Sequence, residues 1–158
     1  MNKLTRDLKV QDVTSTDNKL VFSFASSTPY LRENKKYGEY LEVLEISDEA
    51  IDFVRLVDNK APLLLNHDTD KQIGVVVRAW IEDGKLYCEV KFSDSDEAQQ
   101  IMRDVLASIR RNTSIGYNVD DYQMITSQPG QPPTMLVKKW TPVEVSIVRN
   151  TCRCKCWI

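Results

Sequence analysis

Apolar and polar residues alternate at every second position over much of this chain, which is the spacing of a strand with one buried face. In the first such segment, Leu20, Phe22 and Phe24 share one side. Residues 38–46 repeat the pattern, and one face of that segment is predicted to carry Tyr40, Glu42, Leu44 and Ile46. The pattern therefore indicates a protein rich in β-strands.

A β-hairpin is predicted over residues 73–92. Alternating apolar residues of its first strand are Ile73, Val75, Val77, Ala79 and Ile81. Asp83-Gly84 follows, and this pair favours the positive φ angles of a tight two-residue turn. The inward residues of the return strand are predicted to be Leu86, Cys88, Val90 and Phe92. Alternation on both strands indicates an antiparallel pair with one buried face.

Helical spacing replaces this alternation between residues 94 and 112. Asp94 is a candidate N-cap, with Glu97 three residues later as in a capping box. Apolar residues then recur every three or four positions, at Ala98, Ile101, Met102, Val105, Leu106 and Ile109. Arg110-Arg111 would close the helix at its negative end, with Asn112 as a left-handed C-cap.

The remaining elements are two strands, at residues 113–122 and 135–148, and a shorter helix at residues 50–57. The proline-rich stretch 127–133 is predicted to be a loop, because proline donates no ladder hydrogen bond. Closing a strand-rich sheet hides its edges. We therefore expect the α+β class, in the form of a mainly antiparallel β-barrel with helices outside it.

Length and charge narrow the class of protein. A chain of 158 residues fits one domain, which we place over residues 1–158 with its core at about 20–148 and a cysteine-rich tail at 149–158. A formal net charge of −2 argues against a dedicated nucleic-acid binder, which usually carries a basic excess. No apolar run could span a bilayer and no secretory signal opens the chain, so we expect a cytoplasmic protein.

The cysteines give little indication of a metal. Cys88 lies in an alternating strand, where it is predicted to be a small core residue. Cys152, Cys154 and Cys156 have one residue between each pair. Zinc sites usually place two to four residues between their cysteines and add a second ligand pair. The other candidate ligands are Cys88 and the single histidine. We expect a reduced tail, no metal site and no cofactor.

Residues 63–68, Leu-Leu-Leu-Asn-His-Asp, turn abruptly from apolar to polar. Period two places Leu63, Leu65 and His67 on one side, so the imidazole is expected to continue a buried face where the strand emerges. A lone histidine in such a place is more often structural. Its near-neutral pKa also suits a general base, and both interpretations stay open on these residues alone.

A second candidate segment is residues 113–117, where Ile115 and Tyr117 are predicted to point inward. Ser114 and Gly116 then point the other way, and a serine beside a residue without a Cβ is accessible to a peptide backbone. The simplest interpretation is a serine on a solvated strand face.

The third candidate segment, residues 143–148, places Glu144 and Ser146 opposite an apolar face. A solvated face is again the simplest explanation. Serine catalysis would need the segments in combination, because an imidazole activates the hydroxyl and a third group orients the imidazole. With one histidine in the chain, that third group would be a carboxylate or absent.

The order of these segments resembles the phage prohead protease family. The resemblance extends over about residues 20–148 and is carried by Asn66-His67-Asp68, the hairpin, the helix, Ser114-Ile115-Gly116-Tyr117 and the strand 143–148. The family is related in fold to the herpesvirus assemblins, which implies an assemblin-like β-barrel ringed by helices.

Carried over residue by residue, the resemblance implies Ser114 as nucleophile, His67 as general base and Glu144 as the acidic third residue. We expect Glu144 rather than Asp68 to orient the imidazole, because adjacent side chains on an extended strand point to opposite faces. Family members usually continue with a Pro- and Ala-containing segment where this chain has Arg149 and the residues after it. A backbone N–H near Arg149 is a candidate oxyanion donor.

The resemblance further implies a serine endopeptidase of the Ser-His-Glu type, which cleaves scaffold or capsid-protein segments, or itself, during phage prohead maturation. The expected partners are the phage scaffold and the major capsid protein, and the expected place is the assembling prohead in the host cytoplasm. No nucleic acid or membrane partner is expected, and a homodimer is left open.

Two other functions are consistent with the sequence. The first is a catalytically inactive, protease-like structural component of the capsid or virion. The second is a small barrel that binds nucleic acid or a peptide through exposed aromatic residues, for which the candidates are Trp80, Trp140, Tyr117 and Tyr122. Aromatic packing in or over the core is the more frequent explanation of such residues.

Overall fold

The structure is a computed structural model that describes residues 3–9 and 14–149 of the chain. This part of the chain contains ten strands and one helix, α1, at Asp96–Leu106. The strands are β1 Leu4–Lys9, β2 Thr14–Thr16, β3 Lys19–Ser26, β4 Tyr30–Asn34, β5 Gly38–Leu44, β6 Pro62–Leu65, β7 Asp68–Glu82, β8 Lys85–Phe92, β9 Asn112–Ile125 and β10 Thr134–Val148.

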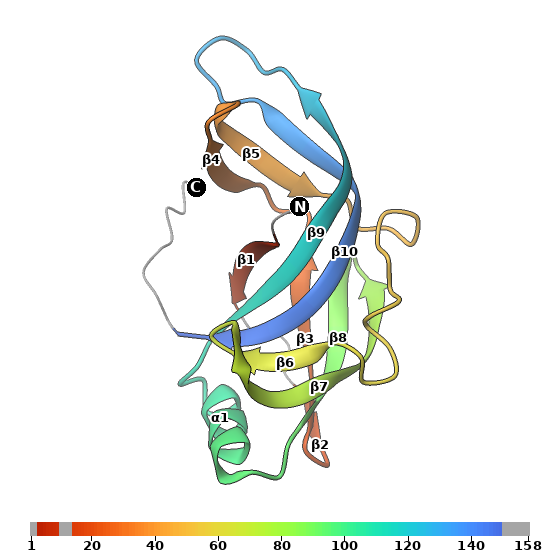
Figure 1. The fold of residues 1–158 in the computed structure, drawn as a ribbon, viewed down its shortest axis with the longest axis vertical. Coiled ribbons are helices and arrows are strands. Elements are labelled where there is room, and N and C mark those ends of the chain that lie inside the picture. The colour runs from red at the N-terminus through yellow and green to blue at the C-terminus, as the bar shows by residue number, and fades with distance from the viewer. Residues whose placement is uncertain (1–2, 10–13, 150–158) are drawn as a thin grey trace.

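The long strands β9 and β10 form the spine of the molecule, as Figure 1 shows. They pair antiparallel along most of their length. All ten strands belong to one sheet with the order β1-β9-β10-β6-β7-β8-β3-β2. On its other edge, β10 pairs in parallel first with β5 and then with β6, and β4 pairs with β5. The second half of β10 therefore lies between β9 and β6.

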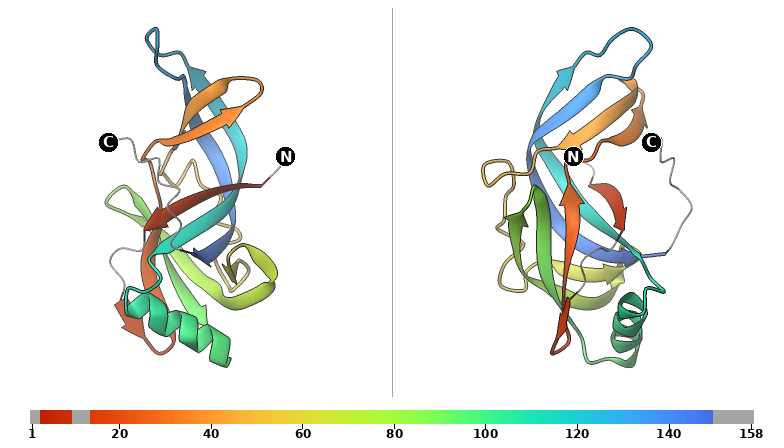
Figure 2. Two further views of the ribbon diagram at one scale, coloured as in Figure 1. Left: turned by 90° about the vertical axis from the view of Figure 1, so that its left-hand side faces the viewer. Right: turned by 180° about the vertical axis from the view of Figure 1, so that it is seen from behind.

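The predicted helix-ringed barrel is wrong, because the sheet is not closed. Within the described residues β1 and β2 lie at opposite ends of the strand order, the chain is 58% strand and 8% helix, and α1 is the single helix. Figure 2 shows α1 at the same end of the molecule as β2. Although the sheet is open, the edge of β10 away from β9 is also paired. β5 and β6 pair with parts of it, and the segment that connects β5 to β6 pairs with it between them, at Trp140.

That connection also replaces the helix predicted at residues 50–57. Ile51 forms an isolated parallel bridge with Trp140, and the Trp140 N–H donates to the carbonyl of Ala50 at 2.9 Å. Ala50, Ile51 and Leu56 are buried. Pairing with β10 and burial in the core have overridden the local preference for a helix.

The predicted hairpin is confirmed, with one change of face. Asp83 and Gly84 both have positive φ, at 48° and 71°, and all four predicted inward residues of β8 are buried. In β7 the register shifts between Val76 and Arg78, and Val76 is buried instead of its two valine neighbours. After this shift Ala79 and Ile81 pack against the core as predicted, so the strand departs from the predicted face only around Val76, and strict alternation does not predict such an irregularity.

The predicted helix forms, but its ends differ. Ser95 is the N-cap, since its hydroxyl accepts the backbone N–H of Ala98, and Asp94 instead accepts a hydrogen bond from Asn18. The helix ends at Leu106, and Ser108 is left-handed with φ 59°. The helix packs on β7 and β8 through Ala98, Ile101 and Val105.

The aromatic residues considered for a binding surface are divided between core and surface. Tyr117 and Trp140 are buried and pack edge to face, with ring centroids 5.7 Å apart. Trp80 stacks on Tyr87, and Tyr122 is exposed. Two of the four candidates are therefore core residues.

Among the described residues, no helix has the length and apolarity that crossing a bilayer would need.

Candidate active site

The pairing of β9 with β10 places two polar pairs side by side. Ser114 lies opposite Ser146, and Gly116 lies opposite Glu144. A register shift between Pro142 and Glu144 precedes these pairs. The solvated face predicted for them is wrong: Ser114 and Ser146 are 0% exposed and Glu144 is 3% exposed. This stretch of sheet is buried on both faces.

His67 lies in a turn and not at the end of a strand, which corrects the prediction. β6 runs beside β10 with Leu65 at the level of Ile147, and Asn66 and His67 then form the connection to β7. Both have left-handed backbones, with φ of 50° and 58°, a conformation that asparagine and histidine adopt more readily than most residues. The Asn66 N–H donates to the Ile147 carbonyl at 2.9 Å, which ties the turn to β10.

The turn brings the imidazole between the serine and the carboxylate. His67 Nε2 lies 2.8 Å from Ser114 Oγ, and His67 Nδ1 is hydrogen-bonded to Glu144 Oε1. Asp68 is exposed, and its carboxylate accepts the N–H of Asp70 at 2.9 Å. The three residues that the resemblance singled out therefore meet in space, and Asp68 lies apart from them.

The charges around Glu144 keep it ionised. Burial alone raises the pKa of this carboxyl, but the hydrogen bond from His67 and the electrostatic interactions with His67 and Lys3 outweigh burial and hold the pKa below its ordinary value. Lys3 Nζ lies 3.3 Å from Glu144 Oε1. An ionised carboxylate only accepts hydrogen bonds, so Nδ1 of the imidazole carries the hydrogen and Nε2 is left to accept from Ser114.

Gly116 provides the space that the Glu144 side chain occupies. A Cβ at this position would lie 2.6 Å from Glu144 Cγ and 2.9 Å from Lys3 Cδ, closer than real Cβ contacts come. The open space predicted over this glycine is therefore filled by protein. The glycine therefore leaves the room in which the Glu144 side chain lies over β9.

The candidate oxyanion donor at Arg149 is already engaged. Its N–H donates to Asn66 Oδ1 at 3.1 Å, and its carbonyl accepts from Asn112 Nδ2 at 3.3 Å. These bonds tie the end of β10 to the turn that carries His67.

No group of three or more His, Cys, Asp or Glu side chains suited to a metal ion occurs in the part of the chain that the structure describes. Cys88 is buried, as predicted, and burial raises the pKa of its thiol. The other three cysteines, at positions 152, 154 and 156, lie outside the described residues.

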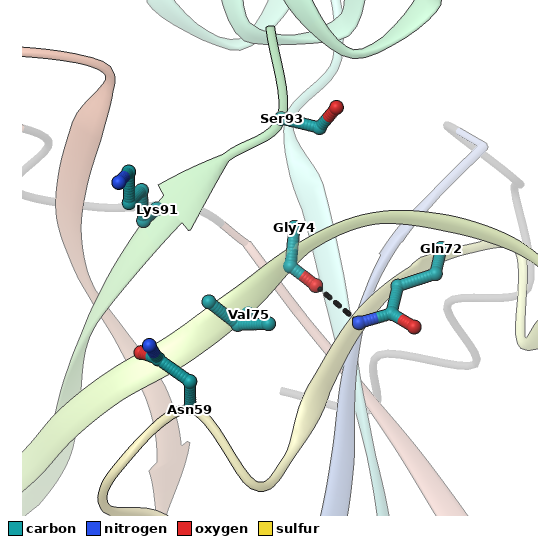
Figure 3. Close-up of a pocket in the computed structure, with 6 residues that line it drawn as sticks. All are labelled: Asn59, Gln72, Gly74, Val75, Lys91 and Ser93. Carbon is teal, nitrogen blue, oxygen red and sulfur yellow. Dashed lines mark hydrogen bonds between the residues drawn. The ribbon is translucent and has the colours of Figure 1, made fainter. Parts of the chain in front are cut away.

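A hollow of about 390 Å³ lies along β7 and β8, away from the three site residues. Figure 3 shows its lining, where the Gln72 amide donates to the Gly74 carbonyl at 3.1 Å. A Cβ on Gly74 would lie 2.2 Å from the Lys91 carbonyl oxygen, so a glycine is needed where β7 meets β8. His67, Ser114 and Glu144 do not line this hollow, which is therefore separate from the candidate site.

Three residues at the site were given no role in the sequence analysis. Period two placed Ser146 on the face of Glu144, but a solvated face was the simplest explanation for both. Asn66 stands beside His67, but its part in holding the turn depends on contacts with β10. Lys3 carries no signal at all, because it is distant in sequence from every residue that it approaches.

A serine hydroxyl bonded to an imidazole, whose other nitrogen meets a carboxylate, is the side-chain arrangement of serine hydrolases. Within that class, the chain belongs to the caudovirus prohead serine protease family, whose sequence profile matches residues 7–152.

Two further similarities concern the fold and the sequence. The fold is similar to the bacteriophage T4 capsid assembly protease, gp21, with a TM-score of 0.61 at 12% sequence identity, over 94% of this chain and 98% of that one. In sequence, 112 residues are 43% identical to the major capsid protein of Halomonas phage phiHAP-1. That match covers 68% of this chain but only 18% of the length of the capsid protein.

Proposed function

We propose that this chain is a serine endopeptidase of prohead maturation in which Ser114 is the nucleophile, His67 the general base and Glu144 the group that orients His67. One observation carries the proposal: Ser114 Oγ lies 2.8 Å from His67 Nε2 while Nδ1 of the same ring is bonded to Glu144. Membership of the prohead protease family supports it.

The chemistry follows from these positions. Ser114 Oγ attacks the scissile carbonyl carbon while its proton passes to His67 Nε2, and Glu144 stabilises the resulting imidazolium through Nδ1–H. His67 then gives the proton to the leaving amine, and the C–N bond breaks. Water, deprotonated by the same nitrogen, hydrolyses the acyl-enzyme and restores the Ser114 hydroxyl.

The proposed substrates are segments of the scaffold or of the major capsid protein, or of the enzyme itself, inside the assembling prohead in the host cytoplasm. Similarity to a protein named as a phage major capsid protein supports a capsid-protein partner. The proposal includes no nucleic acid or membrane partner, and it leaves a homodimer open.

The test is cleavage by purified protein, alone and mixed with its capsid protein. We expect serine-dependent peptide cleavage and labelling by a fluorophosphonate, and Ser114→Ala should abolish both. Circular dichroism of the variant controls for folding. Cleavage by Ser114→Ala at the wild-type rate would show that the nucleophile is another residue.

The pH dependence tests the base. Cleavage should rise with pH as His67 loses its proton, because only the neutral imidazole accepts the serine proton. His67→Ala should remove this limb together with nearly all activity, and chelators should have no effect. Inhibition by a chelator that added zinc reverses would contradict the serine mechanism.

The second candidate function is a protease-like structural component without turnover. Its support is the similarity to part of a major capsid protein. Absence of fluorophosphonate labelling in folded wild-type protein, together with stable incorporation into capsids, would favour it.

A further inference from the structure

Ser146 is a buried polar residue at the candidate site with no role in the mechanism above. It lies on β10 opposite Ser114 and two positions from Glu144, and it is 0% exposed. A hydroxyl withdrawn from water is retained only with hydrogen-bond partners, because burying it alone is unfavourable. Its partners therefore indicate what it does.

Within the described part of the chain, both hydrogen-bonding contacts of the Ser146 hydroxyl go to one residue, His67. Its oxygen accepts the backbone N–H of His67 at 3.2 Å and lies 3.3 Å from Nδ1 of the same residue. A serine oxygen has two lone pairs, so one atom can serve the backbone N–H and share the Nδ1–H with Glu144. The contacts hold the backbone and the ring of His67 relative to β10.

The backbone of His67 needs such support. Its φ of 58° lies in the left-handed region, which is unfavourable for a residue with a Cβ unless its surroundings hold it. The bonds of Asn66 to Ile147 and Arg149 fix the first residue of the turn. The bond to Ser146 fixes the second residue, which carries the imidazole.

We propose that Ser146 is a positioning residue, which sets the turn and the ring orientation of His67 so that Nε2 faces Ser114. It acts through His67 and does not touch the substrate. The charged groups that face the imidazole are Glu144 from β10 and, through that carboxylate, Lys3. The catalytic consequence rests on the proposed function, whereas the effect on His67 itself does not.

The chain offers a direct spectroscopic test because it has a single histidine. Imidazole ¹⁵N NMR of the full chain should show one tautomer, with the hydrogen on Nδ1. In Ser146→Ala we expect a mixture of tautomers and faster hydrogen exchange of the His67 amide, because both lose an acceptor. Ser23→Ala, at another buried strand serine, is the matched control and should leave both signals unchanged.

Kinetics give the second readout. Ser146→Ala should lower kcat by about tenfold to hundredfold, the effect expected for a hydrogen bond to a group that becomes charged, and leave KM nearly unchanged. Ser146→Thr, which keeps the hydroxyl, should recover much of the rate. Should Ser146→Ala not fold, Ser146→Cys, with a similar volume and a weak acceptor, takes its place.

Wild-type imidazole and amide signals in the folded alanine or cysteine variant would overturn the proposal, whether or not the chain is a protease. A wild-type kcat in that variant would overturn it as well. If the wild-type chain cleaves nothing, the proposed function fails, and the NMR comparison alone decides the role of Ser146.

Discussion

Glu144 and Asp68 are the two candidate carboxylates for orienting His67, and single substitutions can distinguish their roles. Glu144 is bonded to Nδ1, while Asp68 is exposed and bonded to the Asp70 N–H. We expect Glu144→Gln to lower turnover by up to about four orders of magnitude, as loss of the triad acid does elsewhere. Asp68→Asn should lower it only mildly. Both variants are measured on one peptide, and a large loss from Asp68→Asn with near-normal Glu144→Gln would reverse the assignment.

Glu144 should also contribute to stability in a pH-dependent way. Its pKa in the folded chain is held below the ordinary value, so its contribution is present above about pH 4.3, the ordinary pKa of a glutamate. That contribution is lost as the pH falls through the lower folded pKa. Urea unfolding of wild type and Glu144→Gln should therefore differ most above this window and converge in stronger acid.

The control for this measurement is Glu49→Gln, at an exposed glutamate outside the site. It should shift unfolding by the same small amount at every pH. A difference between wild type and Glu144→Gln that grows toward acid would contradict the sign of the argument.

At the scale of elements, β1 closes the site. It pairs with β9 in the register that sets Asp7 beside Ser114 and Thr5 beside Gly116, and Ser114 is wholly buried. An extended peptide binds a sheet by adding a strand to a free edge, and β1 occupies the edge of β9 at the serine. A substrate that added to β9 as a strand at this position would need β1 to move.

We expect a chain that begins at residue 10 to cleave peptide and react with a fluorophosphonate faster than the full chain. Lys3→Ala is the matched control, because it removes the ion pair to Glu144 and leaves β1 in place. Size-exclusion chromatography checks for aggregation through the freed edge. Slower reaction of the folded, monomeric truncated chain would show that β1 supports the site instead of covering it.

At the scale of the whole molecule, a buried charge network joins the β4–β5 ribbon to the site strand. Arg32 lies 3.1 Å from Glu42 and donates to the Tyr117 hydroxyl at 2.8 Å and the Thr5 carbonyl at 2.6 Å. Tyr117 in turn donates to Glu42, which is 0% exposed. The network connects β1, β4, β5 and β9.

Removing one member should leave an uncompensated buried charge. We expect Glu42→Ala to lower the free energy of unfolding by about 3–5 kcal/mol, measured by urea titration. Replacing both charged residues, as Arg32→Met with Glu42→Leu, should recover much of this loss, because no charge is then left buried. A loss below about 1 kcal/mol in the single variant, the size found for exposed pairs, would contradict the importance of the network.

Local rules were enough for several features of this chain. The turn at Asp83 and Gly84 and the buried face of β8 follow from alternation and turn chemistry, which depend on residues close in sequence. The family was indicated by the order of its short motifs. The catalytic roles of Ser114, His67 and Glu144 were suggested by that resemblance and stay predictions.

The tertiary structure alone decided how these segments meet. The parallel pairing of β6 with β10 brings the His67 turn to the sheet, and the shift in register after Pro142 sets Glu144 opposite Gly116. It also decided that the sheet stays open and that both faces of β9 and β10 are buried around Ser114. These features depend on contacts between residues far apart in the chain, whereas alternation reports only whether neighbouring side chains share a face.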